Sequence, residues 1–121
     1  MGLADADFTR ALEIESQERL GVKLPGDFAD VLITRKDALY PSVLQAVPGI
    51  KKLLDNLPLA KAVASSASTW ELERNLKITG LIDRFERHVY SADLVTAGKP
   101  APHVFLHAAR QLNIPPLECL V

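Results

Sequence analysis

Cysteine is nearly absent from this sequence. Cys119 is the only one in 121 residues, so no disulfide bond can form within the chain. This excludes the disulfide-rich secreted class and is typical of proteins from a reducing compartment. Cys119 lies in the apolar segment ECLV, a setting that favours a buried structural thiol over a catalytic nucleophile.

Long apolar runs and an excess of one charge are also missing. No stretch approaches the roughly 20 apolar residues of a membrane-spanning helix, and the N-terminal segment MGLADADFTR lacks the pattern of a secretory signal. Fourteen Lys and Arg oppose fifteen Asp and Glu, so the chain has no net field that would attract nucleic acid or an anionic membrane. We therefore expect a soluble cytoplasmic protein whose partners include neither nucleic acid nor a membrane.

Several enzyme motifs do not occur. There is no G-x-G-x-x-G or G-x-x-x-x-G-K-[ST] for a nucleotide, and no G-x-S-x-G for a Ser-His-Asp hydrolase. His103 and His107 are four residues apart and would share a helix face, but neither H-E-x-x-H nor a third ligand accompanies them, so a zinc site is disfavoured. Trp70 and Phe105 are interpreted as packing residues rather than as platforms for stacked bases.

What the chain does contain is a change of character near position 48. Residues 1–47 have helical patterns: one helix is expected to stop at Gly21, and a second covers 28–43. Pro41 should end or kink the second helix. Residues 48–121 alternate between helical and extended patterns, so we expect two parts with different architectures.

The alternation in the second part predicts the fold class. Helices are expected over 50–57, 68–79 and 100–113, and strands over 59–66, 87–92 and 117–121. Helices of about a dozen residues between short apolar strands are typical of βαβ units, so the sequence predicts an α/β fold with a parallel sheet. The last strand is cut off after CLV, which indicates that the chain is part of a longer protein.

Serines gather where the strand over 59–66 ends. Ser65 and Ser66 fall at its carboxyl end, where parallel sheets collect ligands, and a helix begins just beyond them. A helix N-terminus offers unpaired N–H groups and a partial positive charge, which together with serine hydroxyls suit a phosphate oxygen. The alternative is that Ser65, Ser66 and Ser68 only cap the helix and fill a turn. Spacing alone favours this alternative.

Lys99 stands in the stiff segment TAGKPAPHVF. The prolines that follow it exclude a regular helix or a central strand, so the ammonium group is held just before the next helix. A cation fixed near a helix start is a second element that suits an anion. The alternative for a lysine of unknown role is an exposed, solubilising side chain.

The segments VASSAS and GKPAPHVFLHAARQLNIPPLECLV together resemble the haloacid dehalogenase (HAD) superfamily, in its phosphatase and β-phosphoglucomutase-like branch. The resemblance implies a Rossmannoid three-layer parallel sheet over 48–121, preceded over 1–47 by the C-terminal part of a helical cap. It also implies that the Ser65 hydroxyl and the Ser66 backbone N–H hold the substrate phosphoryl group. Lys99 would balance the charge between nucleophile and phosphate.

Two motifs of that family are missing from this chain. The first is an Asp-x-Asp-Gly-Thr/Val loop whose Asp residues act as nucleophile and as general acid/base; Asp5 and Asp7 in DADF have neither a preceding strand nor the glycine. The other is an acidic pair that binds Mg²⁺. The resemblance therefore implies that the chain lacks the nucleophile and the metal ligands, so we expect the 121-residue chain alone to be inactive.

The resemblance implies a part of a Mg²⁺-dependent phosphomonoesterase or phosphomutase. Its substrate would be a small phosphorylated metabolite, a sugar phosphate being one candidate, and it would act through an aspartyl-phosphate intermediate. The absent central strand would leave an open apolar gap, a route to self-association. The alternative is a naturally short, non-catalytic module for phosphate binding or helical interaction, which predicts a cooperative thermal melt for the chain by itself.

Overall fold

The computed structural model describes residues 5–96 and 101–121, and the side chains from residue 8 onward within those ranges. The chain divides into two compact units, Leu3–Val43 and Leu44–Val121, which are described separately. None of the helices within the described ranges is long and apolar enough to cross a membrane.

The first unit is a pair of helices, α1 (Asp5–Leu20) and α2 (Phe28–Val43). Gly21 ends α1 as the sequence predicts: its φ is 65°, and its N–H bonds to the carbonyl of Gln17. This left-handed conformation is one that glycine adopts without a steric cost. None of the sixteen residues of α2 is buried, so this unit has little core of its own.

Pro41 was expected to end or kink α2, and the structure excludes the first of these outcomes. The helix continues through Pro41 to Val43. Proline lacks the N–H that would bond to the carbonyl one turn earlier. Only two residues of α2 follow Pro41, and the helix extends to Val43 without this one backbone bond.

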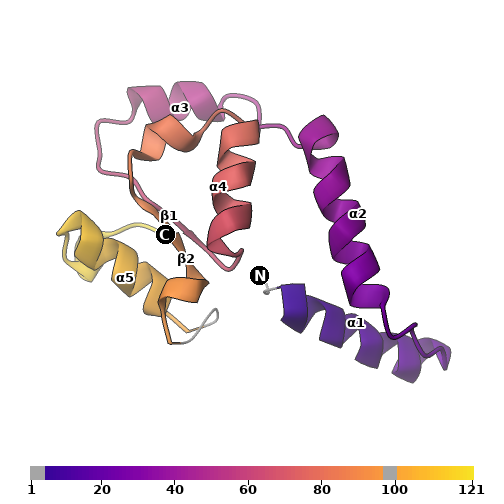
Figure 1. Ribbon diagram of the computed structural model, residues 1–121. Coiled ribbons are helices and arrows are strands. Elements are labelled where there is room, and N and C mark those ends of the chain that lie inside the picture. The colour runs from indigo at the N-terminus through magenta and orange to yellow at the C-terminus, as the bar shows by residue number, and fades with distance from the viewer. Residues whose placement is uncertain (1–4, 97–100) are drawn as a thin grey trace. The chain divides into compact units, whose positions relative to one another are not determined.

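The second unit alternates helices and strands. Its described elements are α3 (Ile50–Asn56), β1 (Val63–Ser65), α4 (Thr69–Ile78), η1 (Ile82–Phe85), β2 (Val89–Ser91), η2 (Ala92–Leu94), α5 (His103–Leu112) and η3 (Pro116–Glu118). β1 and β2 pair in parallel, with Ala64 opposite Tyr90 and Ser65 opposite Ser91. Figure 1 shows α5 on one side of these strands and α4 on the other. The predicted α/β class with a parallel sheet is confirmed.

The core of the second unit lies between the sheet and α5. Val104 is fully buried, and it packs with Tyr90 and Ala108. Ala62, Ala64, Val95 and Phe105 surround this cluster. Successive side chains of a strand point to opposite faces, so Ala64 and Tyr90 face α5 while Ser65 and Ser91 face away from it. Phe105 is a packing residue, as predicted.

Trp70 is not a packing residue, which corrects the interpretation from the sequence. Its side chain is 61% exposed, and the Arg74 guanidinium lies 4.4 Å from the centroid of its ring. The buried residues of α4 are Leu72 and Leu76, four residues apart on one face. Trp70 precedes Leu72 by two residues, a spacing that places it on the other side of a helix.

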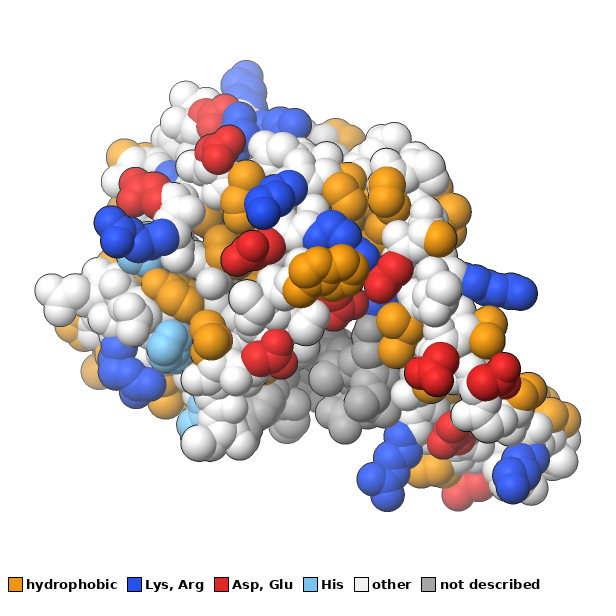
Figure 2. Space-filling view, in the orientation of Figure 1, with side chains coloured by type: hydrophobic (Ala, Val, Ile, Leu, Met, Phe, Trp, Pro, Cys, Tyr) orange, Lys and Arg blue, Asp and Glu red, His pale blue; other side chains and the backbone are white. Residues whose placement is uncertain are grey.

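The expectation of a third strand over 117–121 is also wrong: the described structure has no strand there. Residues 119–121 have no regular structure, and Leu117 and Leu120 are fully exposed. A strand exists only where a neighbour pairs with its backbone, and no described strand pairs with this segment. Figure 2 shows hydrophobic side chains at the molecular surface.

Candidate functional site

Ser65 is the last residue of β1. Its Oγ accepts a hydrogen bond from the N–H of Ala67 at 3.1 Å, which turns the chain after the strand. A serine hydroxyl is one donor as well as an acceptor, and within the described residues the Ser65 O–H has no acceptor. Ser65 therefore shapes the loop and keeps a donor for a ligand oxygen.

Ser66 has a buried hydroxyl that also lacks a partner. Its Oγ is shielded from solvent and makes no hydrogen bond to any described residue. Leaving a buried hydroxyl unsatisfied costs about 1–3 kcal/mol, and such groups are rare in folded proteins. The Ser65–Ser66 pair thus carries unused hydrogen-bonding capacity at the carboxyl end of a parallel strand.

Ser68 has the capping role that the sequence left open. Its Oγ accepts from the N–H of Glu71 at 3.3 Å, while the Glu71 carboxylate accepts from the N–H of Ser68 at 3.2 Å. This reciprocal capping box starts α4. The turn-and-cap interpretation is therefore confirmed for Ser68.

Two residues that the sequence analysis missed hold this loop from the neighbouring strand. Ser91 ends β2 and is 1% exposed, and its Oγ donates to the carbonyl of Ala67 at 2.7 Å. Asp93 follows, and its Oδ2 accepts from the N–H of Thr69 at 3.0 Å. The signal in the sequence was SAD at the end of a strand, a Ser-x-Asp pattern that favours local turn and cap contacts.

The start of α4 is less open to an anion than the sequence suggested. The N–H of Thr69 is bonded to Asp93 and that of Glu71 to Ser68. Two N–H groups of the first turn thus already have partners within the protein. The hydroxyl groups without a described acceptor belong to Ser65 and Ser66, in the loop before α4.

Lys99 lies outside the described residues, so its convergence with Ser65 stays a prediction. The described side chains include no group of three or more His, Cys, Asp or Glu that could hold a metal ion. His107 instead packs edge-on against Tyr90, with ring centroids 5.0 Å apart.

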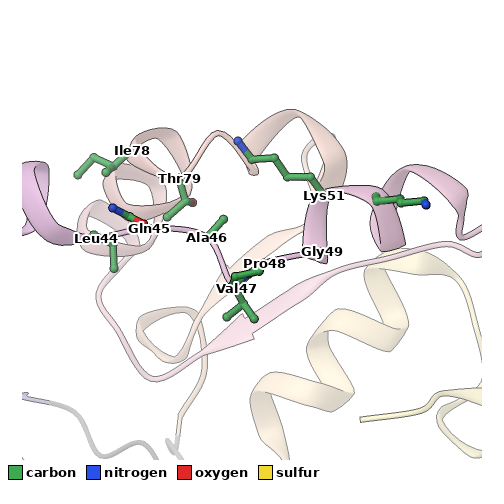
Figure 3. Close-up of a pocket in the computed structure, with 10 residues that line it drawn as sticks. Leu44, Gln45, Ala46, Val47, Pro48, Gly49, Lys51, Ile78 and Thr79 are labelled. Atoms are coloured by element: carbon green, nitrogen blue, oxygen red, sulfur yellow. The ribbon is translucent and has the colours of Figure 1, made fainter.

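A cavity of about 520 Å³ lies elsewhere in the second unit (Figure 3). It is lined by the segment 44–49, Lys51, Lys52, Ile78 and Thr79. Ile78 is the last residue of α4, whereas Ser65 and Ser66 precede its first turn. A helix of ten residues is about 15 Å long, so this cavity is separate from the serine pair.

Comparison with known proteins identifies related chains. A family model described as "Hydrolase: haloacid dehalogenase-like hydrolase" matches residues 2–121. "Putative phosphatase YhcW" of Bacillus subtilis is 34% identical over 107 residues, which cover 86% of this chain and 48% of YhcW. "Protein SUPPRESSOR OF QUENCHING 1, chloroplastic" of Arabidopsis thaliana is 40% identical over 82 residues, which cover 68% of this chain and 7% of that protein.

Two solved structures resemble the chain closely. A haloacid dehalogenase-like protein of unknown function from Agrobacterium tumefaciens has a TM-score of 0.81 and 26% identity, covering 87% of this chain and 48% of that one. A HAD family hydrolase from Deinococcus radiodurans, with bound phosphate and sodium, has a TM-score of 0.70 and 30% identity, covering 87% and 47%. The chain thus spans about half the length of YhcW and of both solved structures.

Proposed function

Because the chain belongs to the haloacid dehalogenase-like hydrolase family, we propose that the whole protein is a Mg²⁺-dependent phosphomonoesterase or phosphomutase. Its substrate would be a small phosphorylated metabolite, with a sugar phosphate as one candidate. A phosphatase role in general agrees with the name of YhcW and with the phosphate in the Deinococcus radiodurans structure.

One observation carries the assignment of the site. The O–H of Ser65 has no acceptor among the described residues, and the buried Oγ of Ser66 beside it has no partner there. Phosphoryl oxygens are strong hydrogen-bond acceptors, and donors aimed at them stabilise the charge that develops during transfer. On this observation we assign to Ser65 a hydroxyl contact with the phosphoryl group. The backbone N–H contact assigned to Ser66 rests on the family resemblance.

Lys99 would supply the positive charge of the same site. An ammonium beside a phosphate dianion lowers the repulsion that an anionic nucleophile meets as it approaches phosphorus. In the proposed reaction an aspartate outside this chain attacks phosphorus and the P–O ester bond breaks. A second aspartate outside this chain protonates the ester oxygen, which leaves as an alcohol. Water then releases phosphate from the aspartyl-phosphate. The residues of this chain bind and orient the phosphoryl group throughout.

The metal and the cap complete the proposal. The family resemblance implies that the Mg²⁺ ligands come from outside this chain, and the proposal adopts this. Residues 1–47 would form the C-terminal part of a helical cap and 48–121 part of the core. The helical character of α1 and α2 supports the cap assignment.

The test is a phosphate-release assay on the full-length protein with Mg²⁺ and a panel of phosphorylated metabolites. Ser65→Ala and Lys99→Ala should each lower kcat/KM at least about tenfold, which corresponds to about 1.4 kcal/mol of barrier. Ser42→Ala in α2 and Lys23→Ala in the loop after α1 are the matched controls and should stay close to the parent. Losses below tenfold in both site variants would overturn the roles assigned to Ser65 and Lys99.

A further inference from the structure

The loop that carries the serine pair is held by the end of β2 and the turn that follows it. The Ala67 carbonyl accepts a hydrogen bond from Ser91 Oγ, and the Thr69 N–H donates one to Asp93 Oδ2; each pair is 24 residues apart in the chain. These two contacts fall on the stretch that joins Ser66 to α4. They are independent of the local bonds that Ser65 and Ser68 make within the loop.

Ser91 connects the loop after β1 to the turn that contains Asp93. Its Oγ donates to the Ala67 carbonyl at 2.7 Å and accepts from the N–H of Asp93 at 3.0 Å. Donor and acceptor of one hydroxyl are thus both in use, so the turn that presents Asp93 is tied to the loop that Asp93 contacts. At 1% exposure, Ser91 is shielded from competing water.

Asp93 differs from Ser91 because it is exposed. Its carboxylate bonds to the first N–H of α4, where a negative charge interacts favourably with the helix dipole. Water can replace an exposed contact of this kind, so its loss should cost the global fold little. Loss of this hydrogen bond should instead change the local position of the segment that ends at Thr69.

We propose that Asp93 is a positioning residue for the phosphate-binding site and acts through Thr69. The proposal rests on the proposed function, because it takes the Ser65–Ser66 pair as the place where phosphate binds. Asp93 touches neither substrate nor reacting atoms. It holds the start of α4 so that the serine donors, three and four residues before Thr69, keep the direction that a phosphoryl oxygen requires.

The positioning role of Asp93 requires a hydrogen-bond acceptor at position 93 but does not require a negative charge. Substitutions can therefore distinguish the two. Asn retains a carbonyl oxygen that can accept from the Thr69 N–H, whereas Ala does not. Asp83 in η1 is an exposed aspartate without a hydrogen bond to any described residue, so Asp83→Ala is the matched control.

The experiment uses the full-length protein and inorganic phosphate as the probe. Phosphate affinity is measured by isothermal titration calorimetry, KM and kcat are measured with the best substrate, and the thermal midpoint reports on the fold. Asp93→Ala should weaken phosphate binding and raise KM by about tenfold, the size expected for one charge-assisted hydrogen bond. Its thermal midpoint should stay within about 3 °C of the parent. Asp93→Asn should restore most of the affinity, and Asp83→Ala should match the parent.

Three results would overturn the positioning role. The first is an affinity and KM within about twofold for Asp93→Ala while Ser65→Ala loses activity, which leaves the proposed function intact. The second is an Asn variant as impaired as the Ala variant, which assigns the effect to charge. The third is a large fall in the thermal midpoint with unchanged phosphate affinity, which makes Asp93 structural only. If Ser65→Ala itself changes nothing, the phosphate site is wrongly placed, and that failure is visible without any Asp93 variant.

Discussion

Ser65 and Ser91 are register partners in the parallel sheet, each the last residue of its strand. Because the carboxyl ends of parallel strands meet at the same edge of a sheet, the two serines lie side by side. Their hydroxyl groups have different roles. Ser91 is buried and uses its Oγ to hold the loop after β1. Ser65 keeps its O–H donor free of described acceptors, which leaves it available for a ligand.

Ser91→Ala should destabilise the protein. The variant leaves the Ala67 carbonyl and the Asp93 N–H without their common partner at a site that is 1% exposed. We expect a loss of about 1–3 kcal/mol in the free energy of unfolding, measured by urea denaturation of the full-length protein. Ser42→Ala, whose hydroxyl bonds to Leu39 on an exposed helix face, should cost much less. Equal losses in the two variants would contradict the structural role of Ser91.

Val104→Ala should create a cavity between α5 and the sheet. Val104 is fully buried and packs against Tyr90 and Ala108. Removing two methyl groups there should lower the free energy of unfolding by about 2 kcal/mol. Val22→Ala, at a position that is 51% exposed, is the control and should stay within about 0.5 kcal/mol of the parent. A Val104→Ala variant as stable as this control would place the core elsewhere.

Tyr90 should make stability fall in alkaline solution. Burial raises the pKa of the Tyr90 hydroxyl above its ordinary value of 10.0, and the positive charge of Arg87 partly offsets this. The folded protein therefore holds this proton more tightly than the unfolded chain. The resulting stability is fully present below pH 10 and is lost as pH rises through the raised pKa.

Urea midpoints from pH 8 to pH 11 would check this, with Tyr90→Phe as the informative variant and Tyr40→Phe as the control. The parent and Tyr40→Phe should lose more stability above about pH 10 than Tyr90→Phe does. Parallel pH profiles for all three proteins would show that Tyr90 has no such linkage.

The 121-residue chain by itself should show no phosphatase activity and should self-associate. The chain has no D-x-D-G motif, and α2 has no buried residue. Leu117, Leu120 and Val121 are almost fully exposed, and exposed apolar side chains of this kind promote association. Light scattering, a thermal melt and a phosphate-release assay on the purified chain would measure these properties. A monomer with a cooperative melt and phosphate affinity would favour the non-catalytic binding module instead.

The sequence was sufficient for features that depend on neighbours within a turn or two. Ser68 and Glu71 form their capping box across three residues, and Gly21 ends α1 through its positive φ. The position of Ser65 at a strand end also followed from the apolar segment before it. Pro41 was expected to end or kink α2; the helix continues to Val43, which excludes an end at Pro41.

Features that join distant parts of the chain could be decided only by the tertiary structure. Asp93 meets Thr69, and Ser91 meets Ala67, across 24 residues, because β1 and β2 pair in one particular register. The segment 117–121 has a strand-like pattern but forms no strand in the described structure, since a strand requires a paired neighbour. The sequence by itself determined the local elements, because hydrogen bonds within a turn or cap depend on adjacent residues. The strand register and the packing of the helices decided which loops are in contact, because contacts between distant segments depend on the positions of all the elements between them.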